Sequence, residues 1–224
     1  MTIPVKYRKT PSVVASYDWA DIKGGTGIQN FYAGEASGAI VGSSSGFVMS
    51  PNTFYSDRVM HANAIVSTDG SYQLVEDVKF DAYFNNPVVI KGIGIVNVPI
   101  GLSGASASHN FSTYVSAHLF HYDGTTETSL IEGSGSAILK NTDGGVGYGY
   151  AVSAIYLNIP ETLFKSGDYL RLQLKQYGHQ TEGATGYALL AHDPMNRATS
   201  INDSNTFGTN PTTLIMQVPF KIDV

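Results

Sequence analysis

The sequence predicts an all-β protein folded as an antiparallel β-sandwich or barrel. In several segments apolar residues occupy every second position, which is the period of a strand that buries one face. Turn-forming residues separate these segments, and no segment keeps an apolar stripe at the spacing of a helix. Many short strands joined by turns are typical of an antiparallel sandwich or barrel.

The alternation is clearest in the segments 78–84, 151–159, 169–177 and 214–224. Between them, Asn85-Asn86-Pro87 and Ser166-Gly167 have the composition of turns, because Gly and Asn adopt positive φ and Pro fixes its φ. The stretch PETLFKSG predicts a single helical turn, which Pro160 would start and Gly167 would end.

The stretch HLFHYDGTTE, residues 118–127, holds two histidines, an aspartate and a glutamate. It continues the alternation of the residues before it, so His118 and His121 differ in parity and point to opposite faces of a sheet. Side chains on opposite faces do not share a metal ion unless a bulge intervenes. Asp123-Gly124 has the composition of a hairpin turn that leads into a return strand from Glu127. The sequence therefore predicts a hairpin here and no metal site.

Charged residues make up 14% of the chain, against about 25% in ordinary domains. The formal net charge is −5 and the basic residues are scattered singly, which argues against a nucleic-acid or membrane partner. Cysteine is absent, so disulfides and thiolate chemistry are excluded. No signal peptide or membrane-spanning run is recognisable. We expect a soluble protein made in a cytoplasm that uses no cofactor.

The first 60 residues lack clear alternation and predict an extended or irregular N-terminal arm over residues 1–60, with the sandwich over 61–224. This segment holds the single tryptophan, Trp19, and the aromatic residues Phe31 and Tyr32 among glycines. Large aromatic side chains that a segment cannot bury by itself pack on something else. We therefore expect Trp19, Phe31 and Tyr32 to bind a partner. Extra edge strands of the same domain are the alternative.

Signals of catalysis are weak. Residues 191–197, AHDPMNR, bring a histidine, an aspartate and an arginine together, but neighbours in an extended chain face apart and Asp before Pro is typical of a turn. We expect a turn with local hydrogen bonds there, followed by a long exposed loop over residues 197–213, which are rich in Ser, Thr and Asn. No dinucleotide fingerprint, P-loop or nucleophile elbow is present. The sequence thus favours a protein that is not an enzyme and has no catalytic residues.

Carbohydrate binding is the alternative with the clearest residues. Sugars are held by exposed aromatic faces together with amide and hydroxyl groups, and the chain holds 14 tyrosines. Tyr148 and Tyr150 share a parity in the glycine-rich stretch GGVGYGYA and would project together as ligand-binding residues. The same pattern is also typical of an ordinary sheet surface or a subunit contact.

The order of the segments resembles a known type of family. After the glycine-rich aromatic arm come KFDAYFNNPVVIKGIGI, the hairpin YVSAHLFHYDGTTETSL, then SGDYLRLQLKQYG and the terminal strand LIMQVPFKIDV. Over residues 70–224 this pattern resembles the jelly-roll virion structural proteins of tailed bacteriophages. It is most similar to the capsid decoration or cement proteins and to head and tail accessory proteins, many of which are trimers.

The resemblance implies a jelly-roll β-sandwich like that of tumour necrosis factor (TNF) and a structural function in the virion. The protein would assemble as a homo-oligomer, with a trimer favoured, and would bind the major capsid protein or other virion proteins. A host glycan is the ligand under the alternative of a carbohydrate- or receptor-binding module. A jelly-roll enzyme acting on polysaccharide is a third hypothesis, which predicts clustered carboxylates or histidines in a concave sheet.

Overall fold

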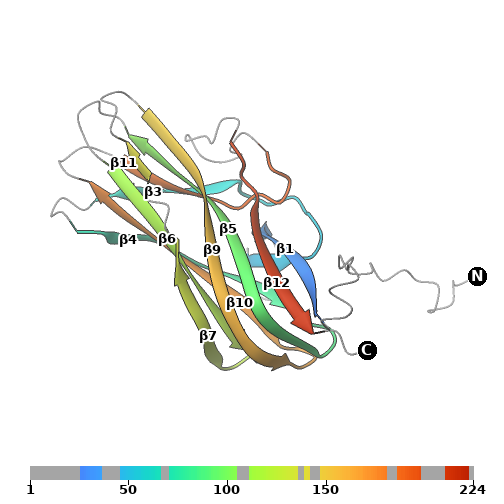
Figure 1. Cartoon of the computed structure of the whole chain (residues 1–224). Coiled ribbons are helices and arrows are strands. Elements are labelled where there is room, and N and C mark those ends of the chain that lie inside the picture. The colour runs from blue at the N-terminus through green and yellow to red at the C-terminus, as the bar shows by residue number, and fades with distance from the viewer. Residues whose placement is uncertain are drawn as a thin grey trace, which may run out of the picture.

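The structure is a computed structural model, and it describes residues 26–36, 46–66, 71–104, 111–135, 139–141, 147–180, 186–197 and 210–221. Every regular element within these residues is a β-strand (Figure 1). The strands are β1 (Thr26–Ala36), β2 (Gly46–Ser50), β3 (Met60–Ile65), β4 (Gln73–Tyr83), β5 (Val88–Gly104), β6 (Phe111–Tyr122), β7 (Glu127–Ser134), β8 (Leu139–Asn141), β9 (Gly147–Phe164), β10 (Tyr169–Gln180), β11 (Gly186–Ala191) and β12 (Leu214–Lys221). The predicted all-β fold class is confirmed.

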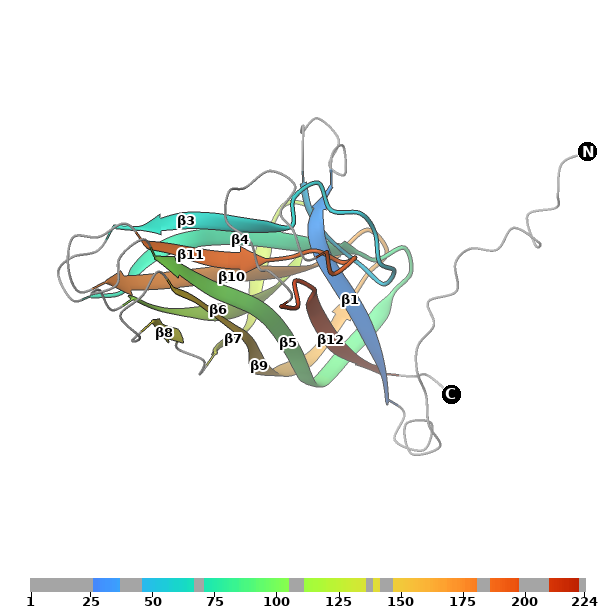
Figure 2. The ribbon, with the colours of Figure 1, turned by 90° about the horizontal axis from the view of Figure 1, so that it is seen from above.

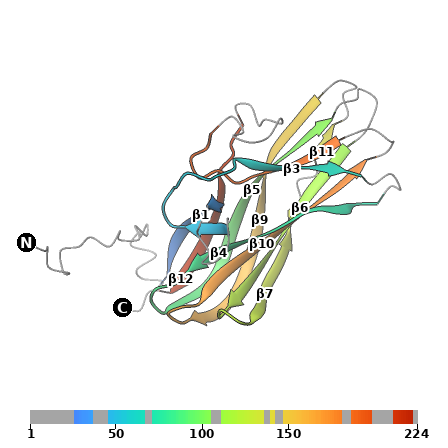
Figure 3. The same ribbon diagram turned by 180° about the vertical axis from the view of Figure 1, so that it is seen from behind.

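The strands form one sheet that folds over into two layers. Its hydrogen-bonded order is β3-β11-β5-β12-β1-β2-β4-β10-β6-β7, with β9 beside β5 and β8 beside β6. Strands β9, β5, β12 and β1 lie side by side in one layer (Figure 1). Strands β4, β10, β6 and β7 form the other, seen from behind in Figure 3. Only β2 and β4 pair in parallel among these strands, so the antiparallel β-sandwich is confirmed.

The register aligns residues of like parity across each layer. One buried row crosses β9, β5, β12 and β1: Ile155, Val96, Met216 and Phe31. A second buried row crosses β4, β10 and β6: Phe80, Leu172 and Leu119. Both rows belong to the same hydrophobic core. The alternation read from the sequence therefore packs the two layers against each other.

The predicted hairpin between β6 and β7 is present. Gly124 adopts a φ of 93°. The Asp123 carboxylate accepts the backbone N–H groups of Thr126 at 2.7 Å and Thr125 at 2.9 Å. These hydrogen bonds, led by the one from Thr126, lower the pKa of Asp123 to about 2. An ionised aspartate thus holds the chain reversal together.

The helical turn predicted for residues 160–167 is wrong. Strand β9 continues through Pro160 to Phe164, and the chain reverses at Gly167, which has a φ of 98°. The register between β5 and β9 shifts next to Gly92, whose φ is 122°. Proline is tolerated at such a bulge because its missing N–H is not needed by the ladder.

Residues 26–36 and 46–60 belong to the sandwich and do not form an arm. Strand β1 pairs along β12, and β2 pairs with β1, which matches the alternative of extra strands in the same domain. The sequence hid this because Gly27 and Gln29 occupy buried positions of β1 where apolar residues were expected. Residues 1–25, with Trp19, lie outside the described residues, so an arm remains a prediction for them.

The shared core yields a stability prediction. The variant Leu172→Ala should lower the free energy of unfolding by about 2 to 5 kcal/mol, because it leaves a cavity between the layers at a side chain that is fully buried. Urea denaturation followed by circular dichroism measures the change. Lys175→Ala, at an outward position of the same strand, is the control and should stay within about 0.5 kcal/mol. Equal losses in the two variants would contradict this packing.

Candidate functional site

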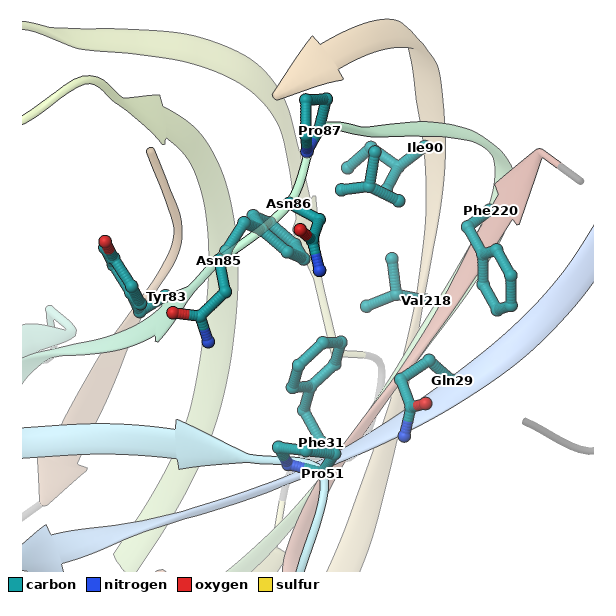
Figure 4. Close-up of a pocket in the computed structure, with 12 residues that line it drawn as sticks. Gln29, Phe31, Pro51, Tyr83, Asn85, Asn86, Pro87, Ile90, Val218 and Phe220 are labelled. Atoms are coloured by element: carbon teal, nitrogen blue, oxygen red, sulfur yellow. The ribbon is translucent and has the colours of Figure 1, made fainter. Parts of the chain in front are cut away.

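A cavity of about 380 Å³ lies at the end of the sandwich, where β1 and β12 meet the turn between β4 and β5 (Figure 4). Figure 2 shows β1 and β12 at one end of the molecule and β3 and β8 at the other. Most of the wall is apolar and includes Phe31, Phe84, Ile90 and Val218. We call this cavity the end pocket. Its volume falls in the range of about 300 to 1,000 Å³ that is typical of ligand sites.

The turn that borders the end pocket is fixed by hydrogen bonds to the neighbouring reversal between β9 and β10. The backbone N–H of Phe84 donates to Asp168 O at 3.0 Å, and that of Gly167 donates to Phe84 O at 2.9 Å. The hydroxyl of Ser166 donates to Asn85 O at 2.8 Å. The ring of Phe84 packs edge-on against Phe31, with 6.4 Å between centroids. The pocket wall is therefore preformed.

Three amide side chains and no charged group line the end pocket: Gln29, Asn85 and Asn86. Figure 4 shows them around the same hollow. The Gln29 side chain is 7% exposed, and its Nε2 donates to Asn30 O at 2.7 Å. Its Oε1 is buried and accepts no hydrogen bond from the described residues. A buried acceptor without a donor costs about 1 to 3 kcal/mol, so the pocket suits an uncharged partner that donates to Gln29.

The outer side of β9, β5, β12 and β1 carries no charge over its central rows. Twelve outward side chains make up this surface, which we call the neutral face: Val152, Ala154, Tyr156, Asn158, Ile93, Ile95, Asn97, Ile215, Gln217, Ile28, Asn30 and Tyr32. Several are large apolar side chains left open to solvent, with Ile93 66% and Tyr156 67% exposed. Charge appears beyond the bulge, where Lys91 forms an ion pair with Glu161 and the nearby Lys221 also lowers the pKa of Glu161.

The outer side of β4, β10, β6 and β7, which we call the charged face, has the opposite character. Arg171 donates to both carboxylate oxygens of Asp81, at 2.6 Å each, and also to Glu127. Lys79 donates to Glu127 at 2.9 Å. The pKa of Arg171 is raised, chiefly by its hydrogen bonds to Asp81, and the hydrogen bond from Lys79 leads the causes that lower the pKa of Glu127. These paired charges remain ionised at neutral pH.

Tyrosines form a row at one end of the charged face. Tyr83, Tyr169 and Tyr122 are partners across β4, β10 and β6. The ring of Tyr169 lies 5.1 Å from that of Tyr83 and 5.6 Å from that of Tyr122, between centroids. The guanidinium of Arg171 lies 4.0 Å above the ring of Tyr122. This row combines aromatic faces with hydrogen-bonding groups, as sugar sites do.

A histidine pair is enclosed near β2, β3 and the end of β11. His192 is fully buried, and its ring lies 4.9 Å from that of His61 and 5.8 Å from that of Phe80, between centroids. Neither ring nitrogen of His192 has a hydrogen-bond partner among the described residues. Burial, followed by the nearby His61, lowers the pKa of His192 to about 3. The Nδ1 of His61 lies 3.1 Å from Glu76 Oε2.

The residues that we expected to bind a partner or ligand lie in different parts of the structure. Phe31 is buried in the core and borders the end pocket, so it is no surface anchor. Tyr32 lies on the neutral face, opposite Ile215. Trp19 and the side chain of Tyr148 lie outside the described residues. Tyr150 is half-buried and packs against Met60 and its neighbours, so it does not present a free ring face.

The histidines of the predicted hairpin lie on opposite faces, as expected. His118 reaches Ser129 Oγ at 2.7 Å, whereas His121 Nε2 reaches Asp168 Oδ2 at 2.6 Å against the buried Phe164 ring. Among the residues that the structure describes, no group of three or more histidines and carboxylates is arranged to hold a metal ion.

Residues 191–197 contain the predicted turn, but its first residues are not exposed. The long exposed loop predicted after them falls mostly on residues 198–209, which lie outside the described residues. His192 and Asp193 are fully buried, because Asp193 accepts hydrogen bonds from the backbone and guanidinium of Arg197. The local hydrogen bonds are those predicted, but they fold the segment inward.

Sequence reasoning also missed Gln29 as a residue of the end pocket. Its shared parity with Phe31 was the available signal.

No protein-family model and no curated protein matches the chain. Solved structures match in part. A CocE/NonD family hydrolase from Staphylococcus aureus has a TM-score of 0.43 at 12% identity, over 86% of this chain and 37% of the hydrolase. An alpha-amino acid ester hydrolase gives 0.49 at 10% identity, over 86% and 36% of the two chains. VP2 of an infectious bursal disease virus subviral particle has a TM-score of 0.28 at 10% identity, over 75% of this chain and 36% of VP2.

These matches correct the expectation that the protein is not an enzyme, because hydrolases stand among the matched structures. The chain spans little more than a third of the length of those hydrolases, and their activity is not transferred to it. The matches with a viral capsid protein are weak likenesses of a β-sandwich module.

No helix in the described part of the chain is long and apolar enough to cross a membrane.

The buried histidine predicts how stability depends on pH. Because the pKa of His192 is about 3 in the folded chain and about 6.5 when unfolded, its contribution is complete above pH 6.5 and falls as the pH drops toward 3. The free energy of unfolding should lose about 1.4 kcal/mol per pH unit from this one proton. Denaturation series between pH 7.5 and 4 measure the slope.

The variant His192→Phe should have a shallower slope, because no proton is taken up at that position on unfolding. His118→Phe, at an outward position on β6, is the control and should keep the slope of the unmodified chain. Identical slopes in the His192 variant and the unmodified protein would contradict the buried neutral histidine.

Proposed function

We propose that the protein is a structural module of a virus particle that assembles with further copies of itself through the neutral face. The observation that supports this proposal is the contrast between the two outer surfaces of the sandwich. One carries a network of ion pairs around Arg171, and the other carries no charge across its central rows. Only the uncharged surface can be buried without desolvating ions.

The composition of the neutral face suits burial against another protein. Charged residues are depleted at the centre of protein interfaces, where aromatic and apolar side chains contact the partner. Tyr156 projects beside Ile95, and Ile93 projects beside Asn158, so exposed apolar groups alternate with amides that can pair across a contact. Another copy of this chain is the partner that this composition fits best.

The placement in a virion rests on the family resemblance of the sequence. In this proposal the protein is made in the host cytoplasm, forms a symmetric homo-oligomer with a trimer favoured, and binds the major capsid protein or other virion proteins. A bacteriophage decoration or accessory protein is the role that follows. Low overall charge and a rigid two-layer core suit a part that is packed among neighbours.

A carbohydrate- or receptor-binding module is the second candidate, and the tyrosine row favours it. Tyr83 is 51% exposed, and its ring contacts that of Tyr169. The guanidinium of Arg171 lies over the ring of Tyr122 in the same row. A sugar ring stacks on an aromatic face and hydrogen-bonds to nearby polar groups. This site would lie on the charged face, which the first proposal leaves open to solvent. A host glycan is the ligand class.

Placing a charge on the neutral face tests the first candidate. The variant Ile93→Arg should dissociate the oligomer into 23.9 kDa chains, because an unpaired guanidinium would be desolvated at the contact. Size-exclusion chromatography with light scattering measures the mass. Val66→Arg is the matched control, since Val66 is 71% exposed but lies outside the neutral face, and it should keep the native mass. Equal masses for both variants and the unmodified chain would contradict the proposed contact.

A glycan array tests the second candidate. Binding that depends on the tyrosine row should fall about fivefold in Tyr83→Ala, because the stacking of a sugar ring on an exposed aromatic ring is worth about 1 kcal/mol. Tyr55→Ala removes a tyrosine that is more exposed and lies elsewhere, and it should leave binding unchanged. Absence of any glycan signal from the unmodified protein would exclude the tyrosine row as a glycan site.

A further inference from the structure

We propose that the end pocket is the docking site of the chain's own N-terminal segment, with the side chain of Trp19 as its occupant. The pocket presents a buried acceptor that has no donor among the described residues, and an occupant that donates a hydrogen bond to Gln29 Oε1 would satisfy it. The indole N–H of tryptophan is a donor only, on a large apolar ring. Trp19 is the only tryptophan in the chain.

The lining of the end pocket selects against charged occupants. Phe31, Phe84 and Phe220 contribute aromatic walls, and Asn85 and Asn86 contribute amides, with no ionisable group of opposite charge to pair with. A carboxylate or an ammonium group would be desolvated there without compensation. A neutral aromatic side chain gains the burial of its ring and satisfies Gln29 as well.

The distance along the chain permits this contact within one molecule. Trp19 precedes Thr26, the first residue of β1, by seven residues, which span at most about 24 Å. Gln29 lies three residues further along the same strand and faces the pocket. The tether therefore ends beside the pocket wall. Such a short tether holds the two groups at an effective concentration of about millimolar, which favours docking in the same chain over docking in another.

The sequence between Trp19 and β1 has the composition of the chain reversal that docking would need. Gly24 and Gly25 stand directly before Thr26, and paired glycines mark turns because both residues adopt positive φ without strain. A reversal there directs the preceding residues back over the end of the sandwich. The segment would thus cover the apolar walls of the pocket.

An engineered disulfide tests the proposal in the full-length protein. The chain has no cysteine, so the pair Ala20→Cys and Asn86→Cys introduces the only two thiols. A bridge forms when the two Cα atoms come within about 7 Å. We expect at least tenfold faster bridging than for Ala20→Cys with Ala64→Cys, where Ala64 is exposed on β3 at the other end. The bridged product should migrate as a single chain on a non-reducing gel.

Two outcomes of the bridging experiment would overturn the proposal. Equal bridging rates for both cysteine pairs would show that the segment has no preferred place at the end pocket. Covalent dimers without bridged single chains would show that the pocket takes the segment of a second copy. Either result is independent of the mass of the Ile93→Arg variant, so the neutral face and the end pocket are tested separately.

The fluorescence of Trp19 tests the hydrogen bond to Gln29. Because Trp19 is the only tryptophan, acrylamide quenching reports its exposure alone. We expect Gln29→Leu to raise the exposed population about fivefold, which corresponds to the loss of one hydrogen bond. Asn30→Leu, whose side chain points to the neutral face, is the control and should leave quenching unchanged. Equal quenching in the Gln29→Leu variant and the unmodified protein would overturn the assigned contact.

Discussion

The antiparallel register of β9, β5, β12 and β1 is the constraint on which the rest of the structure depends. It aligns the buried row of Ile155, Val96, Met216 and Phe31 and, one residue away, the outward row of Tyr156, Ile95, Gln217 and Asn30. A slip of one residue would exchange these rows and bring amides into the core. Burial of the apolar row therefore fixes the register, and the register fixes the outward surface.

Core packing does not require the outward row to lack charge. The charged face stands on an equally well buried row, that of Phe80, Leu172 and Leu119, and yet carries Arg171 and Lys79 among paired carboxylates. The absence of charge from the neutral face is thus a property separate from folding. The proposed burial against a further copy would account for it, because an uncharged surface loses little solvation when it is covered.

Much of the architecture was predictable from the sequence, because strands with one buried face leave a period of two. This holds for β4, β10 and β12, and for the hairpin at Asp123. Strand β1 was missed because Gln29 and Gly27 break the apolar pattern at inward positions. The end pocket was not predictable, since Asn85 and Asn86 indicate only a turn until β1 is placed against them.

The inward burial of His192 was not predictable from the sequence either, because it accompanies hydrogen bonds between Asp193 and Arg197 that the sequence does not reveal.

Strand β1 contributes residues to both the end pocket and the neutral face. Its inward Gln29 borders the end pocket, and its neighbour Asn30 lies on the neutral face.

Hydroxyl-radical footprinting of the unmodified protein at low and high concentration tests the central claim most directly. If the neutral face holds copies together, oxidation of Tyr156 should fall severalfold as the concentration rises, whereas Tyr55, which is 72% exposed and lies outside that face, should react equally at both concentrations. Unchanged oxidation of Tyr156 in a sample whose mass shows an oligomer would contradict the account.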